Sequence, residues 1–219
     1  ESDSRDDLRL EVLEIAIARA PAAADAVVAQ IKDRFTRRMA QALQAGARGD
    51  TAIARSIDEW ARGARANQTA PFDDPETARR DSWDMVLRGA VAANNLEAFT
   101  KALAARPPFN TPADAESASR ILRVLMREGR ADWIRVFGPA LKLPEGETVS
   151  VDEDIGPMRN LPVDKLVAVA EAGEAAGRYR GAIVDTAIEM LVARGAVTEA
   201  RDLFGRLGRI EELNRVTFD

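Results

Sequence analysis

Along the sequence, the first candidate functional side chains form a basic stretch near the N-terminus. Its positive charges come from Lys32, Arg34, Arg37, Arg38 and Arg48. Cations in this density bind carboxylates, phosphates or anionic lipid, so one interpretation is a docking surface. The other is a solvated helix face opposite Glu11 and Glu14. Asp33 interrupts the stretch, and Phe35 is its only aromatic neighbour. Because nucleic-acid sites usually combine uninterrupted positive charge with several aromatic side chains, this argues against nucleic acid.

A second charged cluster is acidic. It comprises Glu145, Glu147, Asp152, Glu153 and Asp154. Three interpretations are open: a mobile loop, a surface for a basic partner, and a calcium site. The alternating ligands, central Gly and terminal Glu of a calcium loop are absent, so a metal is the least favoured.

Catalytic residue types are scarce. The chain has no Cys and no His, which removes thiolate nucleophiles, imidazole bases and the usual ligands of zinc, haem and iron–sulfur clusters. Its paired carboxylates are sequence neighbours, which helix caps and solvated faces explain. They are Asp58 with Glu59, Asp73 with Asp74, Glu171 with Glu174, and Glu211 with Glu212. We predict no catalytic site, metal site or cofactor, and hence a protein that is not an enzyme.

The three tryptophans each lie on an apolar stripe at helical spacing. They are Trp60, Trp83 and Trp133. Packing in a helical core is the default expectation for such residues. The alternative is that one of them is an exposed anchor in a binding groove.

Composition limits the class of protein and its partners. The 219 residues are 46% hydrophobic and 31% charged, as in globular proteins. A net charge of −5 makes nucleic acid an unfavoured partner. The chain begins at Glu1 without Met, so we expect that its true N-terminus is missing and that 1–6 is a disordered linker end. A membrane contact would then need a segment absent from this chain, and both a cytoplasmic and a periplasmic location are open.

Hydrophobic periodicity predicts helices along the chain. One stripe predicts a single long helix with the basic stretch on its opposite face: Val27, Ile31, Phe35, Met39 and Leu43. Caps are expected at Asp50, at Asp74 before Pro75, and at Thr111 with Asp114 reaching back. Gly138-Pro139 predicts a kink or an early helix end.

A short turn pattern organises these helices into hairpins. A Gly or Asn ends one helix, and the residue five positions later is apolar on the next. The turns are at Gly49, Asn94, Gly129, Gly177, Gly195 and Gly208, and the apolar positions are Ala54, Phe99, Ile134, Ala182, Ala200 and Leu213. We therefore predict an all-α fold of stacked antiparallel helical hairpins, an α-solenoid of about eleven helices.

The same pattern suggests how the domain is organised. An irregular array of hairpins is expected over 7–142, and a loop or joint over 143–161. The segment 162–219 is expected to continue the array.

The C-terminal part, best over 170–216, resembles tetratricopeptide helical repeats. The resemblance depends on Ala170-x-x-Gly173, Ala176-Gly177-Arg178-Tyr179-x-x-Ala182 and Gly195-x-Val197-x-x-Ala200-x-x-Leu203-Phe204. It implies paired helices that present a concave face to a peptide or another protein. It implies no catalytic residues.

These observations favour a non-catalytic function. We predict an interaction or scaffold module that presents a helical groove to a partner protein, as part of a larger bacterial protein. Two alternatives stay open. One is binding of nucleic acid or an anionic membrane through the basic face Lys32–Arg48, and the other is a regulatory or catalytic helical domain that uses carboxylates only.

Overall fold

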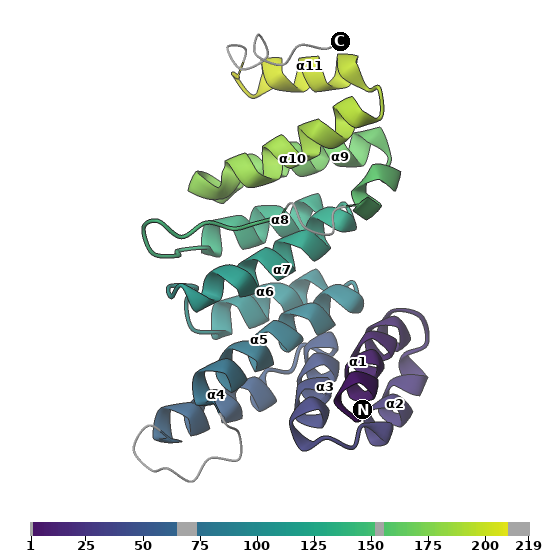
Figure 1. Cartoon of the computed structure of the whole chain (residues 1–219), viewed down its shortest axis with the longest axis vertical. Helices are drawn as coiled ribbons and strands as arrows, with labels where there is room; N and C mark the ends of the chain where they lie inside the picture. Colours follow the sequence, from purple (N-terminus) through teal and green to yellow (C-terminus); the bar gives the residue numbers. More distant parts are fainter. Residues whose placement is uncertain (1, 65–73, 152–155, 210–219) are drawn as a thin grey trace. The chain divides into compact units, whose positions relative to one another are not determined.

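In the computed structural model, the described part of the chain is built from helices joined by turns and loops, which confirms the all-α fold class (Figure 1). The structure describes residues 2–64, 74–151 and 156–209, and these residues contain no β-strand. The chain divides into two compact units, Glu1–Pro107 and Pro108–Asp219. The stacking of hairpins into a solenoid stays a prediction.

Unit 1 holds six α-helices and a short 3-10 turn among its described residues. They are α1 (Ser2–Arg19), the 3-10 turn η1 (Pro21–Ala23), α2 (Ala24–Gln30), α3 (Arg34–Ala47), α4 (Ala52–Ala64), α5 (Pro75–Ala92) and α6 (Leu96–Ala105). The helix α1 begins at Ser2, inside the stretch where a linker end was expected. Residues 1–7 contain no Pro or Gly that would stop a helix from extending this far.

The single long helix predicted from the stripe Val27–Leu43 is wrong. The chain leaves helix α2 at Ile31, whose backbone is extended (φ −73°, ψ 121°), and begins α3 at Arg34. Asp33 causes the new start, because its Oδ2 accepts a hydrogen bond of 2.6 Å from the backbone N–H of Thr36. Ile31, Met39 and Leu43 are buried, and Val27 and Phe35 are partly buried. The apolar stripe therefore indicated the inward-facing side chains, but its continuity as one helix is wrong.

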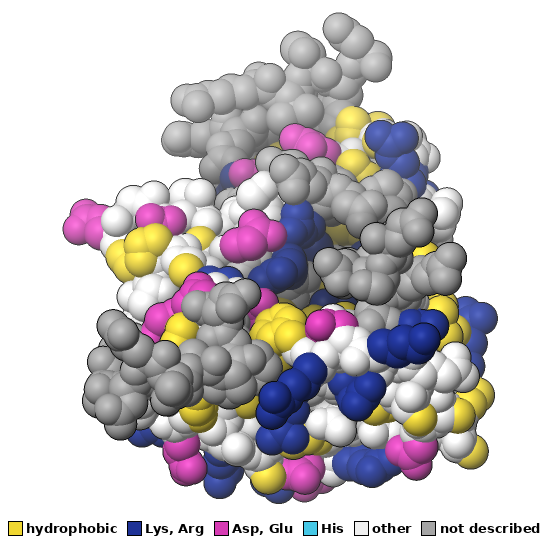
Figure 2. All heavy atoms as spheres, turned by 60° about the horizontal axis from the view of Figure 1, so that its bottom comes forward, with side chains coloured by type: hydrophobic (Ala, Val, Ile, Leu, Met, Phe, Trp, Pro, Cys, Tyr) yellow, Lys and Arg dark blue, Asp and Glu magenta, His cyan; other side chains and the backbone are white. Residues whose placement is uncertain are grey.

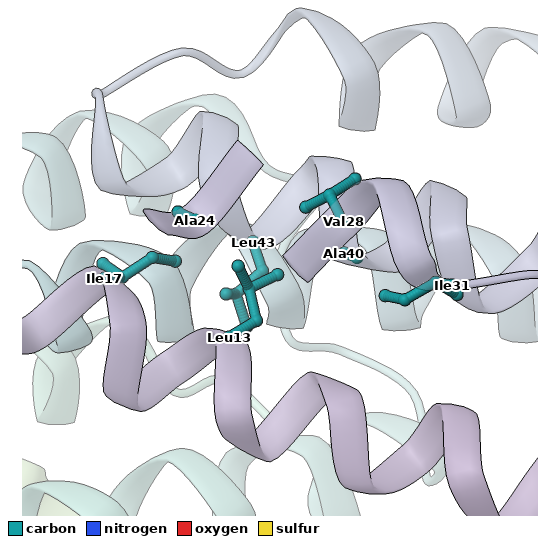
Figure 3. Close-up of a cluster of buried hydrophobic side chains, with 7 residues drawn as sticks. All are labelled: Leu13, Ile17, Ala24, Val28, Ile31, Ala40 and Leu43. Atoms are coloured by element: carbon teal, nitrogen blue, oxygen red, sulfur yellow. The ribbon is translucent and has the colours of Figure 1, made fainter. Parts of the chain in front are cut away.

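The break between α2 and α3 lets three helices share one core. Figure 3 shows the side chains that meet there, and all are buried: Leu13, Ile17, Ala24, Val28, Ile31, Ala40 and Leu43. Leu13 and Ile17 come from α1, and Ala40 and Leu43 from α3. This cluster holds α3 against the N-terminal hairpin.

Two glycines set how closely α3 and α5 approach. A Cβ atom on Gly89 of α5 would lie within 3.0 Å of the Leu43 carbonyl group, and one on Gly46 of α3 would meet the backbone of Val86 in the same way. The backbones are therefore in direct contact at this crossing, and only Gly fits there. The crossing fixes α3, the helix that carries most of the basic stretch.

Unit 2 is also helical. Its elements are α7 (Ala113–Arg127), α8 (Ala131–Phe137), η2 (Gly138–Ala140), η3 (Gly156–Asn160), α9 (Val163–Gly173), η4 (Glu174–Tyr179), α10 (Arg180–Ala193) and α11 (Val197–Arg206). The early helix end predicted at Gly138-Pro139 is confirmed, since α8 stops at Phe137 and continues as a 3-10 turn. Asp114 reaches back as expected, and its Oδ2 accepts hydrogen bonds from Thr111 N (2.9 Å) and Thr111 Oγ1 (2.7 Å).

The predicted turns are confirmed in both units. All six turn residues have positive φ, between 52° and 75°, and Asn94 is the non-glycine among them. Of the apolar positions that follow these turns, Ala182 is partly buried. Four others are fully buried: Ala54, Phe99, Ile134 and Ala200. Leu213 lies outside the described residues.

The segment between α8 and α9 packs onto its own unit. Leu143, Val149 and Val151 are buried, and the backbone N–H of Ser150 donates to Ser119 Oγ at 3.0 Å. Arg178 donates to the carbonyl oxygens of Leu143 and Pro144. The described ends of this stretch are therefore attached to the helices around them.

Candidate functional site

The basic stretch contributes three arginines to a hollow in unit 1. The hollow has a volume of about 490 Å³ and lies between α3 and α4. Its α3 side consists of Arg34, Arg37, Arg38 and Gln41, and its α4 side of Ser56, Ile57 and Trp60. We call it the arginine pocket. Among the described residues, no carboxylate lines it.

Helical spacing explains why these side chains lie on the same side of α3. Arg34, Arg38 and Gln41 are four and three residues apart on α3, which places them on one face. Figure 2 turns the lower side of the Figure 1 view forward, and Lys and Arg side chains lie there among exposed hydrophobic ones. Sequence periodicity predicted the cationic face but missed the opposite wall, because Ser56, Ile57 and Trp60 lie on a separate helix.

The three arginines differ in how firmly they are held. Arg37 donates from Nε to the Ile31 carbonyl at 2.7 Å and from Nη2 to the Lys32 carbonyl at 3.3 Å. It therefore stabilises the break that precedes α3. Arg38 donates from Nη1 to Gln41 Oε1 at 3.3 Å. Arg34 is exposed and makes no hydrogen bond or ion pair within the described part of the chain.

Acids do not neutralise these charges. Among the described residues, none of the three arginines forms an ion pair. All three lie in the first five residues of α3, whose first turn contains no acid. The N-terminus of a helix carries a partial positive charge, so cations there are unfavourable and anions favourable. The Asp33 carboxylate already caps this N-terminus, so the preference of the pocket for an anion comes from the three guanidinium groups.

The apolar side of the pocket is formed by α4. Ile57 is 3% exposed and packs with Met39 and Ala78 in a buried cluster, against which Trp60 also packs. Trp83 and Trp133 are buried, as the core interpretation predicted, whereas Trp60 is only partly buried. Of the three tryptophans, Trp60 is the one placed to contact a ligand.

The remaining members of the basic stretch lie elsewhere. Arg48 forms an ion pair of 3.4 Å with Asp25, which also accepts a hydrogen bond from Gln44. Lys32 is exposed in the break before α3 and does not line the pocket. The break at Asp33 thus separates Lys32 from α3, and Asp25 pairs with Arg48, while the role of the face Lys32–Arg48 in binding stays a prediction.

A second hollow in unit 1 has no such charge excess. It has a volume of about 390 Å³, and Asp50 and Glu59 there face the same space as Arg55 and Lys101. Two acids and two bases can neutralise one another, so this hollow has no preference for a charged ligand. The arginine pocket is the stronger candidate.

The acidic cluster lies only partly within the described residues. Glu145 is exposed and Glu147 partly buried, on either side of a turn in which Glu147 N–H donates to the Pro144 carbonyl at 3.2 Å. Asp152, Glu153 and Asp154 lie outside the described residues. Within the described ranges, no group of three or more acids is placed to hold a metal ion.

Most of the described paired carboxylates have cationic or backbone partners, whereas Glu59 is exposed to solvent. Asp58 pairs with Arg62 at 2.8 Å, and Asp74 caps α5 through Glu76 N–H. In unit 2, Glu171 pairs with Arg206 at 3.0 Å and Glu174 with Arg180 at 3.2 Å. Asp73, Glu211 and Glu212 lie outside the described residues. These contacts agree with the interpretation as caps and surface ion pairs.

Comparison with family models, with curated proteins and with solved structures found no match for this chain. The resemblance to tetratricopeptide repeats therefore stays a prediction. None of the helices in the described part of the chain has both the length and the apolar character needed to cross a membrane.

Proposed function

We propose that this protein is a non-catalytic interaction module that binds another protein through the arginine pocket. A single observation carries the proposal: three arginines without ion-pair partners among the described residues lie beside a partly exposed tryptophan. Arg and Trp are the residue types that most often dominate the energy of protein interfaces. Their combination in one hollow supports binding more than it supports a solvated surface.

The unfavourable position of Arg34 at the start of α3 supports the same conclusion. Arg34 is the exposed first residue of α3, and a cation there opposes the helix dipole by about 0.3–1 kcal/mol. Residues that act against local stability are expected at functional sites. An acidic partner would remove this unfavourable term on binding.

The proposal is tested by comparing two charge-reversal variants. Arg34→Glu changes the pocket, and Arg55→Glu makes the same change on α4 outside it. Proteins retained from a lysate of the source cells by immobilised wild-type chain are identified by mass spectrometry. We expect a partner that Arg55→Glu retains and Arg34→Glu loses. Identical sets from all three proteins would contradict the proposal.

The same arginines favour one alternative, binding of a polyanion such as nucleic acid. Affinity for a polyanion falls steeply with salt, because bound counterions are released. Titration with a labelled single-stranded oligonucleotide at several salt concentrations tests this alternative. Binding that weakens steeply with salt and is lost in Arg34→Glu would favour it over a protein partner.

A further inference from the structure

The hydrogen-bonding groups of the arginine pocket are mostly donors. All five N–H groups of Arg34 are available, and Arg38 uses only Nη1. The Ser56 hydroxyl and the Gln41 amide add further donors, while Gln41 Oε1 already accepts from Arg38. A ligand that satisfies these groups must be rich in acceptors. A carboxylate, which only accepts, fits this requirement.

Arg37 has a different role from its two neighbours. Its Nε and Nη2 donate hydrogen bonds to the Ile31 and Lys32 carbonyls, and these bonds fix the position of the guanidinium. It adds positive charge to the pocket and fixes the start of α3, and we regard it as a positioning residue. Arg34 and Arg38 are the residues with donors free to bind a ligand.

The other half of the pocket requires an apolar group. Ile57 and Trp60 line this half, and Trp60 is only partly buried. A carboxylate alone would leave this surface in contact with water. Burying apolar area there adds about 25 cal/mol per Å². The best ligand therefore carries an apolar group close to its acidic group.

Size and overall charge indicate the source of this ligand. A volume of about 490 Å³ holds a few side chains and not a folded surface. The chain as a whole has a charge of −5, which repels a long polyanion outside the pocket. An extended protein segment delivers one or two charges at a single point and avoids this repulsion.

From these observations we infer that the arginine pocket binds an extended segment of a partner protein by two neighbouring side chains. An Asp or Glu side chain binds Arg34 and Arg38, and an adjacent aromatic or aliphatic side chain packs against Trp60. This inference rests on the proposed function and adds the chemistry of the partner.

A random dodecapeptide library displayed on phage tests it with the whole chain as bait. The selection is run in parallel on the wild type, on Arg34→Gln and on the matched control Arg55→Gln. Both variants remove one exposed positive charge from unit 1. We expect wild type and control to enrich peptides in which an acid neighbours an apolar residue, and Arg34→Gln to lose them.

A fluorescence titration then measures affinity for the best synthetic peptide. Charge-assisted hydrogen bonds predict a loss of about tenfold or more for Arg34→Gln and little change for Arg55→Gln. Replacing the acid in the peptide should cost as much as Arg34→Gln, and the two changes together should cost little more. Circular dichroism confirms that each variant is folded.

The possible outcomes distinguish failure of the inferred peptide chemistry from failure of the proposed function. Enriched peptides that lack an acid, or that bind Arg34→Gln as well as wild type, would overturn the inference and leave an interaction module intact. If no peptide is enriched and a labelled oligonucleotide or anionic vesicles bind instead, both the inference and the proposed function fail. A chain that binds none of these probes leads to the same conclusion.

Discussion

Gly89 lies where α5 crosses α3, and replacing it with Ala should destabilise unit 1. The added Cβ would enter the carbonyl group of Leu43, within 3.0 Å. The obstacle is backbone, so no change of side-chain rotamer can make room. The two helices would have to separate, and the contacts around the crossing would loosen with them.

The magnitude follows from two opposing terms. Ala is a better helix former than Gly by about 1 kcal/mol, which stabilises the variant. Overpacking in a closely packed core costs about 1–3 kcal/mol, and the upper end applies where backbone must move. We therefore expect Gly89→Ala to lower the free energy of unfolding by about 2 kcal/mol.

Gly63→Ala is the matched control. Gly63 lies near the end of α4 and is exposed, and an added Cβ would meet no atom within 4 Å. With no clash, only the helix preference remains, and the variant should gain about 0.5 kcal/mol. Urea titrations followed by circular dichroism measure both values. If Gly89→Ala were neutral or stabilising, the close approach of α3 and α5 would be refuted.

Three further predictions concern single side chains of unit 1. Leu13→Ala removes a fully buried side chain and should cost about 2–5 kcal/mol, whereas Val12→Ala, at a half-exposed position beside it, should stay within about 0.5 kcal/mol in the same urea titration. Equal losses would contradict the orientation of α1. Asp33→Ala removes the cap of α3 and should cost about 1 kcal/mol by thermal unfolding, and an unchanged midpoint would show that the cap is dispensable. Arg34→Glu should stabilise the chain by about 0.5 kcal/mol, because an acid suits the helix N-terminus, while it abolishes binding at the pocket. A lower melting temperature would mean that Arg34 supports the fold.

Much of the fold could be predicted because its signals are local. The turn residues with positive φ, the cap at Asp74 and the back-reaching Asp114 depend on groups within a few positions along the chain. A periodic stripe is also local, but it reports which residues are buried and not whether the helix is continuous. For this reason the stripe from Val27 to Leu43 was wrongly predicted to be one helix. Asp33 is a residue type that commonly caps a helix, and it could have indicated the new start.

The candidate site was predicted less well. Helical spacing predicted one basic face, and of its members Arg34, Arg37 and Arg38 line the pocket. Spacing says nothing about partners distant in the sequence, so the pairing of Arg48 with Asp25 was missed. For the same reason Trp60 could not be distinguished from the buried Trp83 and Trp133.

The sequence by itself determined an all-helical chain, the positions of its turns and the arginines of one helical face. These features depend on backbone hydrogen bonds and steric limits that act over about four residues. The tertiary structure decided which charges are neutralised and which face a hollow with an apolar wall. That outcome depends on how α3 lies beside α4, which carries the apolar wall, and beside α5, which it approaches closely at Gly46 and Gly89.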